Sequence, residues 1–167
     1  MDSPNATRGI FVAGLRNAHA MEKQALSVMQ PQLDRLESYP ELQGLLEKHY
    51  RETEDQLARL DQIFASLGES PSGMKDTVLG VMGSMQTMGH SIASDEVLKN
   101  HMADYMFEHF EIAAYTSLIS MARSLGLTTV IPLLQQTLEE ERRCAELLLD
   151  ALPRVTETFL QRTEMAQ

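Results

Sequence analysis

Four long segments of the chain repeat apolar residues at helical spacing, and short breaks separate them. The segments cover residues 8–37, 41–67, 95–125, and a stretch from about 128 to beyond 149. Residues three and four positions apart lie on one face of an α-helix, so each segment predicts a helix with one face toward a core. The breaks contain Pro40, Gly68 and Gly126, which are residues that interrupt or end helices.

A different stretch, residues 69–94, separates the second segment from the third. It opens with Ser70-Pro71-Ser72-Gly73 and continues with apolar residues that predict a short extra helix within a long crossover. Two antiparallel helical hairpins joined by one long crossover make the ferritin-like type of four-helix bundle. The sequence therefore predicts an all-α, ferritin-like four-helix bundle, with residues 1–167 as a single domain. Pro31 predicts a kink or an early end in the first helix, and Pro153 a break or restart in the fourth.

Charge and composition exclude several classes of protein. The formal net charge is −10, and no dense cluster of lysine and arginine is present, so we expect no nucleic-acid partner. No apolar run approaches the roughly 20 residues that span a bilayer, so we expect no membrane partner. The start MDSPNATRG lacks the charged and apolar regions of a signal peptide, and Cys144 is the only cysteine. Both features favour a cytoplasmic location.

Ionisable residues interrupt the apolar stripes at the middle of each predicted helix. They are Glu22 in the first helix, His49 and Glu52 in the second, Glu108 and Glu111 in the third, and Glu141 in the fourth. A carboxylate in a bundle core is unfavourable unless it is protonated, paired or bound to metal. Lysine and arginine are too rare on these stripes to neutralise the set, whereas divalent or trivalent cations prefer carboxylate oxygen. In the second helix, Thr53 competes with Glu52 for the inward position.

The spacing of these residues fits a single site shared by two hairpins. Glu22 and Glu52 are 30 residues apart, and so are Glu111 and Glu141. Equal spans in two antiparallel hairpins place their carboxylates at matching heights, as a pseudo-twofold site at the centre of the bundle requires. The pattern predicts a pair of metal ions there.

Four segments resemble the YciE/YciF family of ferritin-like proteins, and the resemblance extends over residues 9–152. These segments are NAHAMEKQAL, KHYRETEDQLARLDQIFASLG, FEHFEIAAYTSL and QTLEEERRCAELL. The resemblance implies a rubrerythrin-like bundle, a homodimer, an association with bacterial stress, and a di-iron centre. Its implied ligands are Glu22, His49, Glu52, Glu108, Glu111 and Glu141.

The chain departs from the usual di-iron pattern in two places. That pattern has Glu-x-x-His on two helices, whereas this chain has Glu52-x-x-Asp55 and Glu141-x-x-Cys144. His49 compensates in part for the missing histidines, and His19, one turn before Glu22, is a further candidate. Manganese or zinc in place of iron is a consequence to expect. Cys144 is interpreted as a small buried residue, with a place among or beside the ligands as the alternative.

Two functions follow from these features. The first is a di-metal carboxylate protein that holds two iron ions and acts on oxygen or peroxide, as a ferroxidase-type oxidoreductase would. The second is a dimeric helical scaffold or stress-related interaction protein whose metal site is vestigial or holds another metal. The set of glutamates favours the first hypothesis, and the replaced histidines favour the second.

Overall fold

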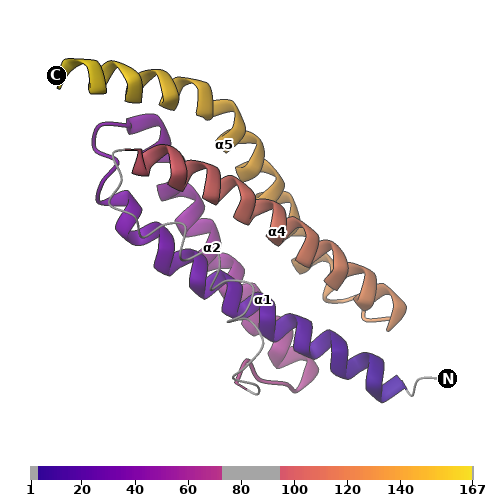
Figure 1. Cartoon of the computed structure of the whole chain (residues 1–167). Helices are drawn as coiled ribbons and strands as arrows, with labels where there is room; N and C mark the ends of the chain where they lie inside the picture. Colours follow the sequence, from indigo (N-terminus) through magenta and orange to yellow (C-terminus); the bar gives the residue numbers. More distant parts are fainter. Residues whose placement is uncertain (1–3, 73–94, 167) are drawn as a thin grey trace.

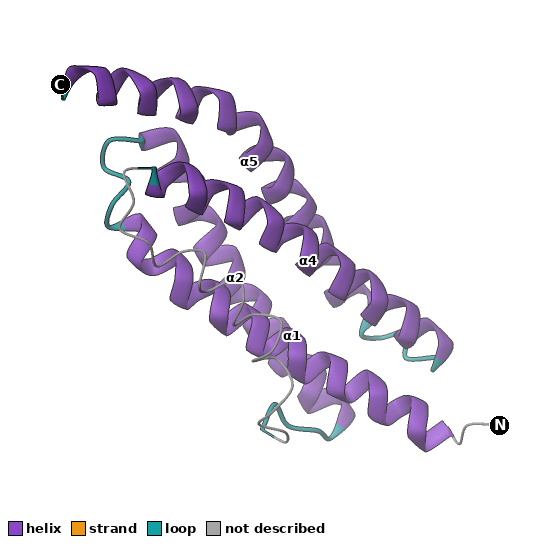
Figure 2. Ribbon diagram, viewed as in Figure 1, coloured by secondary structure: helices purple, strands orange, loops and turns teal. Residues whose placement is uncertain are grey.

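The computed structural model describes residues 4–72 and 95–166, which form a four-helix bundle (Figures 1 and 2). The helices are α1 (Pro4–Leu33), α2 (Pro40–Leu67), α4 (Glu96–Ser124) and α5 (Ile131–Met165). No strand occurs within these two ranges. The prediction of an all-α four-helix bundle is confirmed. The short extra helix predicted in the crossover falls in residues 73–94, outside the described residues.

Each helix packs against two neighbours. α1 contacts α2 and α4, and α5 contacts α4 and α2. α2 ends at the same end of the bundle as the N-terminus, whereas α4 begins at the opposite end (Figure 1). The connection between α2 and α4 therefore joins opposite ends of the bundle, as a single long crossover requires.

Prolines and glycines set the helix ends largely as the sequence predicts. Pro40 and Pro132 lie in the first turns of α2 and α5, where a missing backbone donor does no harm. Gly68 follows α2 with a φ of 67°, and Gly126 follows α4 with a φ of 69°. A positive φ is unfavourable for residues with a Cβ, so glycine is the suitable residue at both places.

The two prolines inside helices differ in their effect. α1 ends at Leu33, earlier than the predicted 37, and Pro31 lies within its last turn. Pro153, by contrast, neither ends nor restarts α5, which continues to Met165. α5 bends along its C-terminal part, as a helix with an internal proline does (Figure 1).

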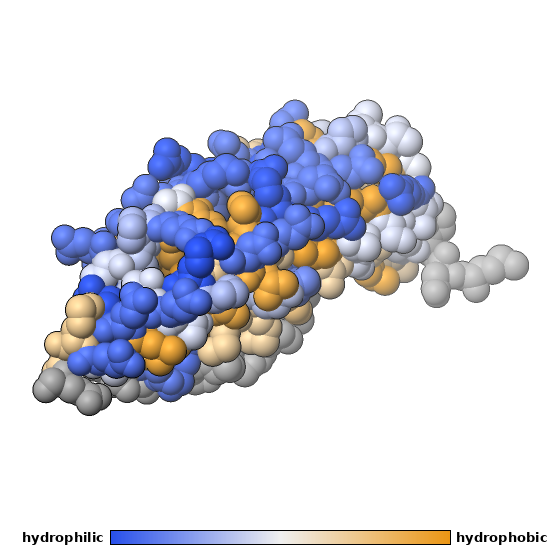
Figure 3. Space-filling view, turned by 90° about the horizontal axis from the view of Figure 1, so that it is seen from above, coloured by the Kyte–Doolittle hydropathy of each residue, from blue (hydrophilic) through white to orange (hydrophobic). Residues whose placement is uncertain are grey.

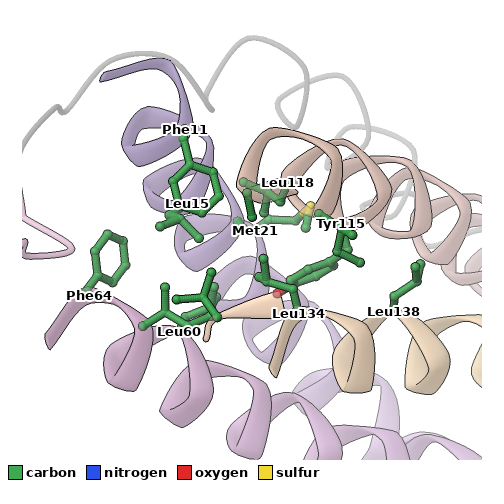
Figure 4. Packing of buried hydrophobic residues seen from close by; sticks show 14 residues of the cluster. Phe11, Leu15, Met21, Leu60, Phe64, Tyr115, Leu118, Leu134 and Leu138 are labelled. Carbon is green, nitrogen blue, oxygen red and sulfur yellow. The ribbon is translucent and has the colours of Figure 1, made fainter. Parts of the chain in front are cut away.

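The buried apolar residues form two clusters, one toward each end of the bundle. The first contains Phe11, Leu15, Leu60, Phe64, Leu118 and Leu134, with others (Figure 4). The second contains Ala25, Met29, Leu42, Leu46, Leu148 and Val155, with others. On every helix, the predicted ionisable residues lie between the residues that belong to the first cluster and those that belong to the second. The core therefore has a polar layer enclosed between two apolar ones.

The face of the bundle seen in Figure 3 is mostly hydrophilic, with apolar side chains gathered toward its middle. Exposed apolar residues include Met102, Met106 and Phe110, which are four residues apart and share one face of α4. Among the helices described, none has a stretch long and apolar enough to cross a membrane.

Candidate metal centre

Four of the six predicted ligands meet in the polar layer. A nitrogen of His49 and one oxygen each of Glu108, Glu111 and Glu141 all lie within 4.8 Å of one another. They come from α2, α4 and α5, and all four side chains are buried. An ion with bonds of about 2.1 Å separates opposite ligands by about 4.2 Å. Small side-chain rotations would therefore bring this set to bonding distance of one cation.

Glu22, the predicted ligand from α1, lies in the same layer and is fully buried. The hydroxyl of Tyr115 donates a hydrogen bond to its Oε1. Its Oε2 has no hydrogen-bond partner in the described part of the chain. Tyr115 therefore fixes the orientation of Glu22 and leaves one oxygen available.

Glu52, the sixth predicted ligand, lies at the edge of the layer instead. Its Oε1 accepts a hydrogen bond of 2.6 Å from Arg143 on α5, and its Oε2 is 3.8 Å from Nδ1 of His49. Thr53 is the buried residue at this point, as is Gln56 one turn further. The inward positions of α2 thus follow the spacing 46, 49, 53, 56, 60, which turns residue 52 toward the surface.

Gln56 is a member of the layer that the sequence analysis missed. It is fully buried, and its amide donates a hydrogen bond to Oε1 of Glu141. The signal was available, since residue 56 follows Leu46, His49 and Thr53 at continuous helical spacing. Asp104, one turn before Glu108, was also missed; it is buried and accepts a 2.9 Å hydrogen bond from Gln32.

The other candidate ligands differ in their positions. His19 lies with its Nε2 3.3 Å from Oδ1 of Asp61, and Asp55 is exposed; neither belongs to the cluster. Cys144 is 3% exposed, and its sulfur lies within 4.8 Å of ligand atoms of His49 and Glu108. Of these three residues, Cys144 alone is placed to join the site.

Apart from His49, no buried basic side chain pairs with these carboxylates within residues 4–72 and 95–166. Arg59 is the one buried arginine or lysine there, and it pairs with Glu140. His49 is the nearest partner, with Nε2 3.2 Å from Oε1 of Glu108 and 3.6 Å from Oε2 of Glu141. One imidazole can compensate one carboxylate, which leaves three glutamates without a positive partner.

Protons would have to compensate the remaining charge in the metal-free protein. Burial raises the pKa of Glu22 to about 8. Burial also raises the pKa of Glu111 and of Glu141 well above the usual value, and neighbouring carboxylates add to both shifts. Glu108 is the exception: burial raises its pKa, but the attraction of His49 outweighs this effect, so the pKa is lowered. Burial alone would lower the pKa of His49, but the charge of Glu108 raises it well above the ordinary value.

The layer has free ligand atoms that suit a metal. Both oxygens of Glu111 and one oxygen each of Glu108 and Glu141 lack hydrogen-bond partners among the residues the structure describes. Buried polar atoms are normally satisfied, so several unsatisfied oxygens at one place need an explanation. Hard cations bound by oxygen and imidazole would supply it. The residues present therefore fit a metal centre.

A groove of about 430 Å³ between α2 and α5 leads from the surface to this centre. His49 and Cys144 line it, together with Glu52, Arg143 and the apolar side chain of Leu147. Ions and small molecules therefore have a path to one side of the polar layer.

The chain is similar to known proteins over most of its length. The chain is 31% identical over 143 residues to the protein YciF of Escherichia coli strain K12, covering 80% of this chain and 82% of that protein. The crystal structure of the E. coli stress protein YciF superimposes with a TM-score of 0.77 at 26% identity, covering 94% of this chain and 99% of that one. A crystal structure from Xanthomonas campestris pv. campestris gives a TM-score of 0.80 at 33% identity, covering 95% and 99%.

One family matches nearly the whole chain. Residues 6–161 match the family described as a domain of unknown function, DUF892. The similarity to YciF extends over most of both proteins, and the helices superimpose over almost their full length. This protein therefore belongs to the DUF892 family.

Proposed function

We propose that this protein is a ferritin-like di-metal carboxylate protein that holds two iron ions and acts on oxygen or peroxide. The observation that carries the proposal is the convergence of His49, Glu108, Glu111 and Glu141 within 4.8 Å in a buried layer that lacks a sufficient protein counter-charge. Glu22, fully buried with one free oxygen in the same layer, extends the set to all four helices.

Charge balance supports two divalent ions rather than one. Glu22, Glu108, Glu111 and Glu141 carry four negative charges when ionised, and two divalent cations supply four positive charges. One ion would be held by the converging set with His49. The other would be held by Glu22 together with oxygens of Glu111, whose two oxygens both lack a hydrogen-bond partner within the described ranges. Carboxylates from all four helices projecting inward are typical of di-metal proteins of this bundle type.

The protein's own residues would position and enclose the ions. Tyr115 orients Glu22, and Gln56 orients Glu141, through hydrogen bonds to one oxygen of each. The apolar clusters above and below the layer exclude water from it. Ferrous iron bound there would supply the electrons for reduction of oxygen or peroxide. The groove at His49 and Cys144 is the route by which ions and oxidant would enter.

The alternative is a helical scaffold in which the layer binds no metal. The hydrogen bonds from Tyr115 and Gln56 favour it, because they satisfy one oxygen each of Glu22 and Glu141 without any ion. So does the presence of a single histidine in the converging set. The expected homodimer and cytoplasmic location are compatible with either function and stay predictions.

Metal content and ferrous titration decide between the two functions. Protein purified without chelator is analysed for metals, then titrated with ferrous iron under anaerobic conditions and exposed to oxygen or peroxide. We expect binding of about two equivalents of iron and an absorbance change on oxidation. Manganese or zinc in the purified protein would instead indicate the other metals considered above.

A pair of matched variants locates the site. Glu111→Gln with Glu141→Gln should abolish iron binding, since the replacements keep the shape of the side chains but remove two charged ligands. The control is Glu139→Gln with Glu146→Gln, which alters two exposed glutamates on the outside of α5 and should leave binding unchanged. Iron uptake by the first double variant equal to that of the parent would show that the centre is not the site.

A further inference from the structure

The polar layer contains a second way to bind a cation, through the only cysteine. The sulfur of Cys144, a nitrogen of His49 and an oxygen of Glu108 lie within 4.8 Å of one another. Cys144 is one turn beyond Glu141 on α5, so it faces the same layer from a different height. These three atoms form a nitrogen, oxygen and sulfur set that shares His49 and Glu108 with the other set but has Cys144 in place of Glu111 and Glu141.

Two residues of this set have buried atoms without a hydrogen-bond partner, which points to a ligand. Nδ1 of His49 and Oε2 of Glu108 have no hydrogen-bond partner in the parts of the chain that the structure describes. The two residues are 2% and 3% exposed, so water does not compensate them freely. A cysteine alone would carry no conclusion, but here two buried polar side chains with unused atoms converge on it.

The side of the set that carries the thiol opens to solvent. His49 and Cys144 both line the groove between α2 and α5, whereas Glu111 and Glu141 do not. A cation held by the three side chains would therefore have access to a water molecule for its fourth coordination position. Three protein ligands and one water make a common tetrahedral arrangement for zinc.

We propose that His49, Glu108 and Cys144 form a site for a thiophilic divalent cation such as zinc. Thiolate favours such ions over iron held by carboxylates alone, and imidazole suits both. Because His49 and Glu108 belong to both sets, the two modes of binding exclude each other. The layer would thus select between metals: Glu111 and Glu141 complete a site for iron, and Cys144 completes one for zinc. The inference shares its centre with the proposed function but does not require that iron binds.

Binding to this set involves loss of one proton and no change of oxidation state. The S–H bond of Cys144 breaks, the sulfur bonds to the cation, and the proton leaves to solvent through the groove. Uptake should therefore release a proton and strengthen as pH rises.

Cobalt(II) is a suitable probe, because a cobalt–thiolate bond gives an intense near-ultraviolet charge-transfer band and tetrahedral cobalt absorbs strongly in the visible. We expect the parent protein to show both on titration with cobalt(II). Cys144→Ser should lose the thiolate band and bind zinc at least about 10- to 100-fold more weakly. Replacement of residues that only hydrogen-bond to metal ligands already lowers metal affinity by that factor. Cys144→Ala is a second variant, and circular dichroism verifies that both are folded.

Glu111→Gln and a competition experiment separate this inference from the proposed function. Glu111→Gln should keep the cobalt–thiolate band and lose iron. One equivalent of zinc should block uptake of one of the two ferrous ions in the parent and do so much less in Cys144→Ser. If the parent binds iron but gives no thiolate band with cobalt(II), this inference is wrong and the proposed function stands. A thiolate band without any iron binding would leave the zinc site and refute the iron function.

Discussion

Replacement of Glu22 by glutamine should make the metal-free protein less sensitive to alkaline conditions. Glu22 is fully buried and its pKa is raised to about 8, chiefly by burial. Glutamine has the same shape, and its amide oxygen can still accept the hydrogen bond from Tyr115. The substitution therefore removes one titration while it keeps the packing.

The expected magnitude follows from the difference between the folded and unfolded pKa of Glu22. A group whose pKa is raised on folding stabilises the protein fully below its unfolded pKa, and this contribution is lost as pH rises through the folded pKa. With pKa values of 4.5 unfolded and about 8 folded, the loss is about 1.4 kcal/mol per pH unit within that interval. Between about pH 5.5 and about pH 7.5, the free energy of unfolding should fall by about 2.5 kcal/mol on account of this group.

Urea denaturation of chelator-treated protein at several pH values measures this effect. We expect the parent to lose about 2.5 kcal/mol more than Glu22→Gln across that pH interval. The glutamine itself can change the free energy of unfolding by a constant amount, and comparing the slopes of this free energy against pH removes that constant. Glu146→Gln, which changes an exposed glutamate on α5, serves as the control and should follow the parent. Parallel pH profiles for the parent and Glu22→Gln would refute the reasoning that Glu22 folds in its protonated form. This pH interval lies above the range in which ion-paired carboxylates titrate. Glu52, for example, has a pKa lowered to about 2, so it does not contribute to the measured difference.

Two further predictions test the groove and the core. Leu147→Trp should slow metal uptake in stopped-flow measurements without a change in the amount bound. The reason is that Leu147 lines the groove and an indole would fill part of it. Leu149→Trp is the control, because Leu149 is exposed and lies outside the groove lining. An unchanged uptake rate in Leu147→Trp would mean that ions enter elsewhere. Leu15→Ala should lower the free energy of unfolding by about 2–5 kcal/mol, as deletion of a fully buried leucine does. A loss below about 1 kcal/mol in urea denaturation would show that the apolar cluster around Leu15 is loosely packed.

The helices were predictable because their signals are local and repeated. Apolar spacing over whole segments fixes which residues share a face, and Gly68 and Gly126 mark helix ends through a backbone conformation that side chains disfavour. The end of α1 and the continuity of α5 depend on how Pro31 and Pro153 are accommodated. A proline removes a backbone donor wherever it lies within a helix, so its presence in the sequence alone does not tell whether the helix bends, as α5 does, or ends.

A site residue could be predicted where only one residue of a helix turn can point into the core. It could not be predicted where two adjacent residues compete for that direction. Glu22 and Glu141 are each flanked by clear apolar positions, and the structure buries both. On α2, residues 52 and 53 lie on either side of the inward direction, and the structure buries Thr53 and leaves Glu52 half-buried beside Arg143. That pairing comes from another helix, so the sequence of α2 alone does not reveal it.

The energetic cost of the polar layer favours a metal centre over a scaffold. A bundle that served only as a scaffold would be more stable with apolar residues at these positions, since buried ionisable groups without partners destabilise a fold. Glu22, Glu111 and Glu141 have raised pKa values, so protons must be retained in the core at neutral pH. Cations would replace those protons and gain the Coulomb energy of four carboxylates. Metal binding should therefore release protons and should tighten as pH rises, and it should also offset the loss of stability that Glu22 causes between about pH 5.5 and about pH 7.5. If the proposed function is right, the same residues would make the metal-free protein less stable and the metal-bound protein more stable, a combination for which a scaffold has no need.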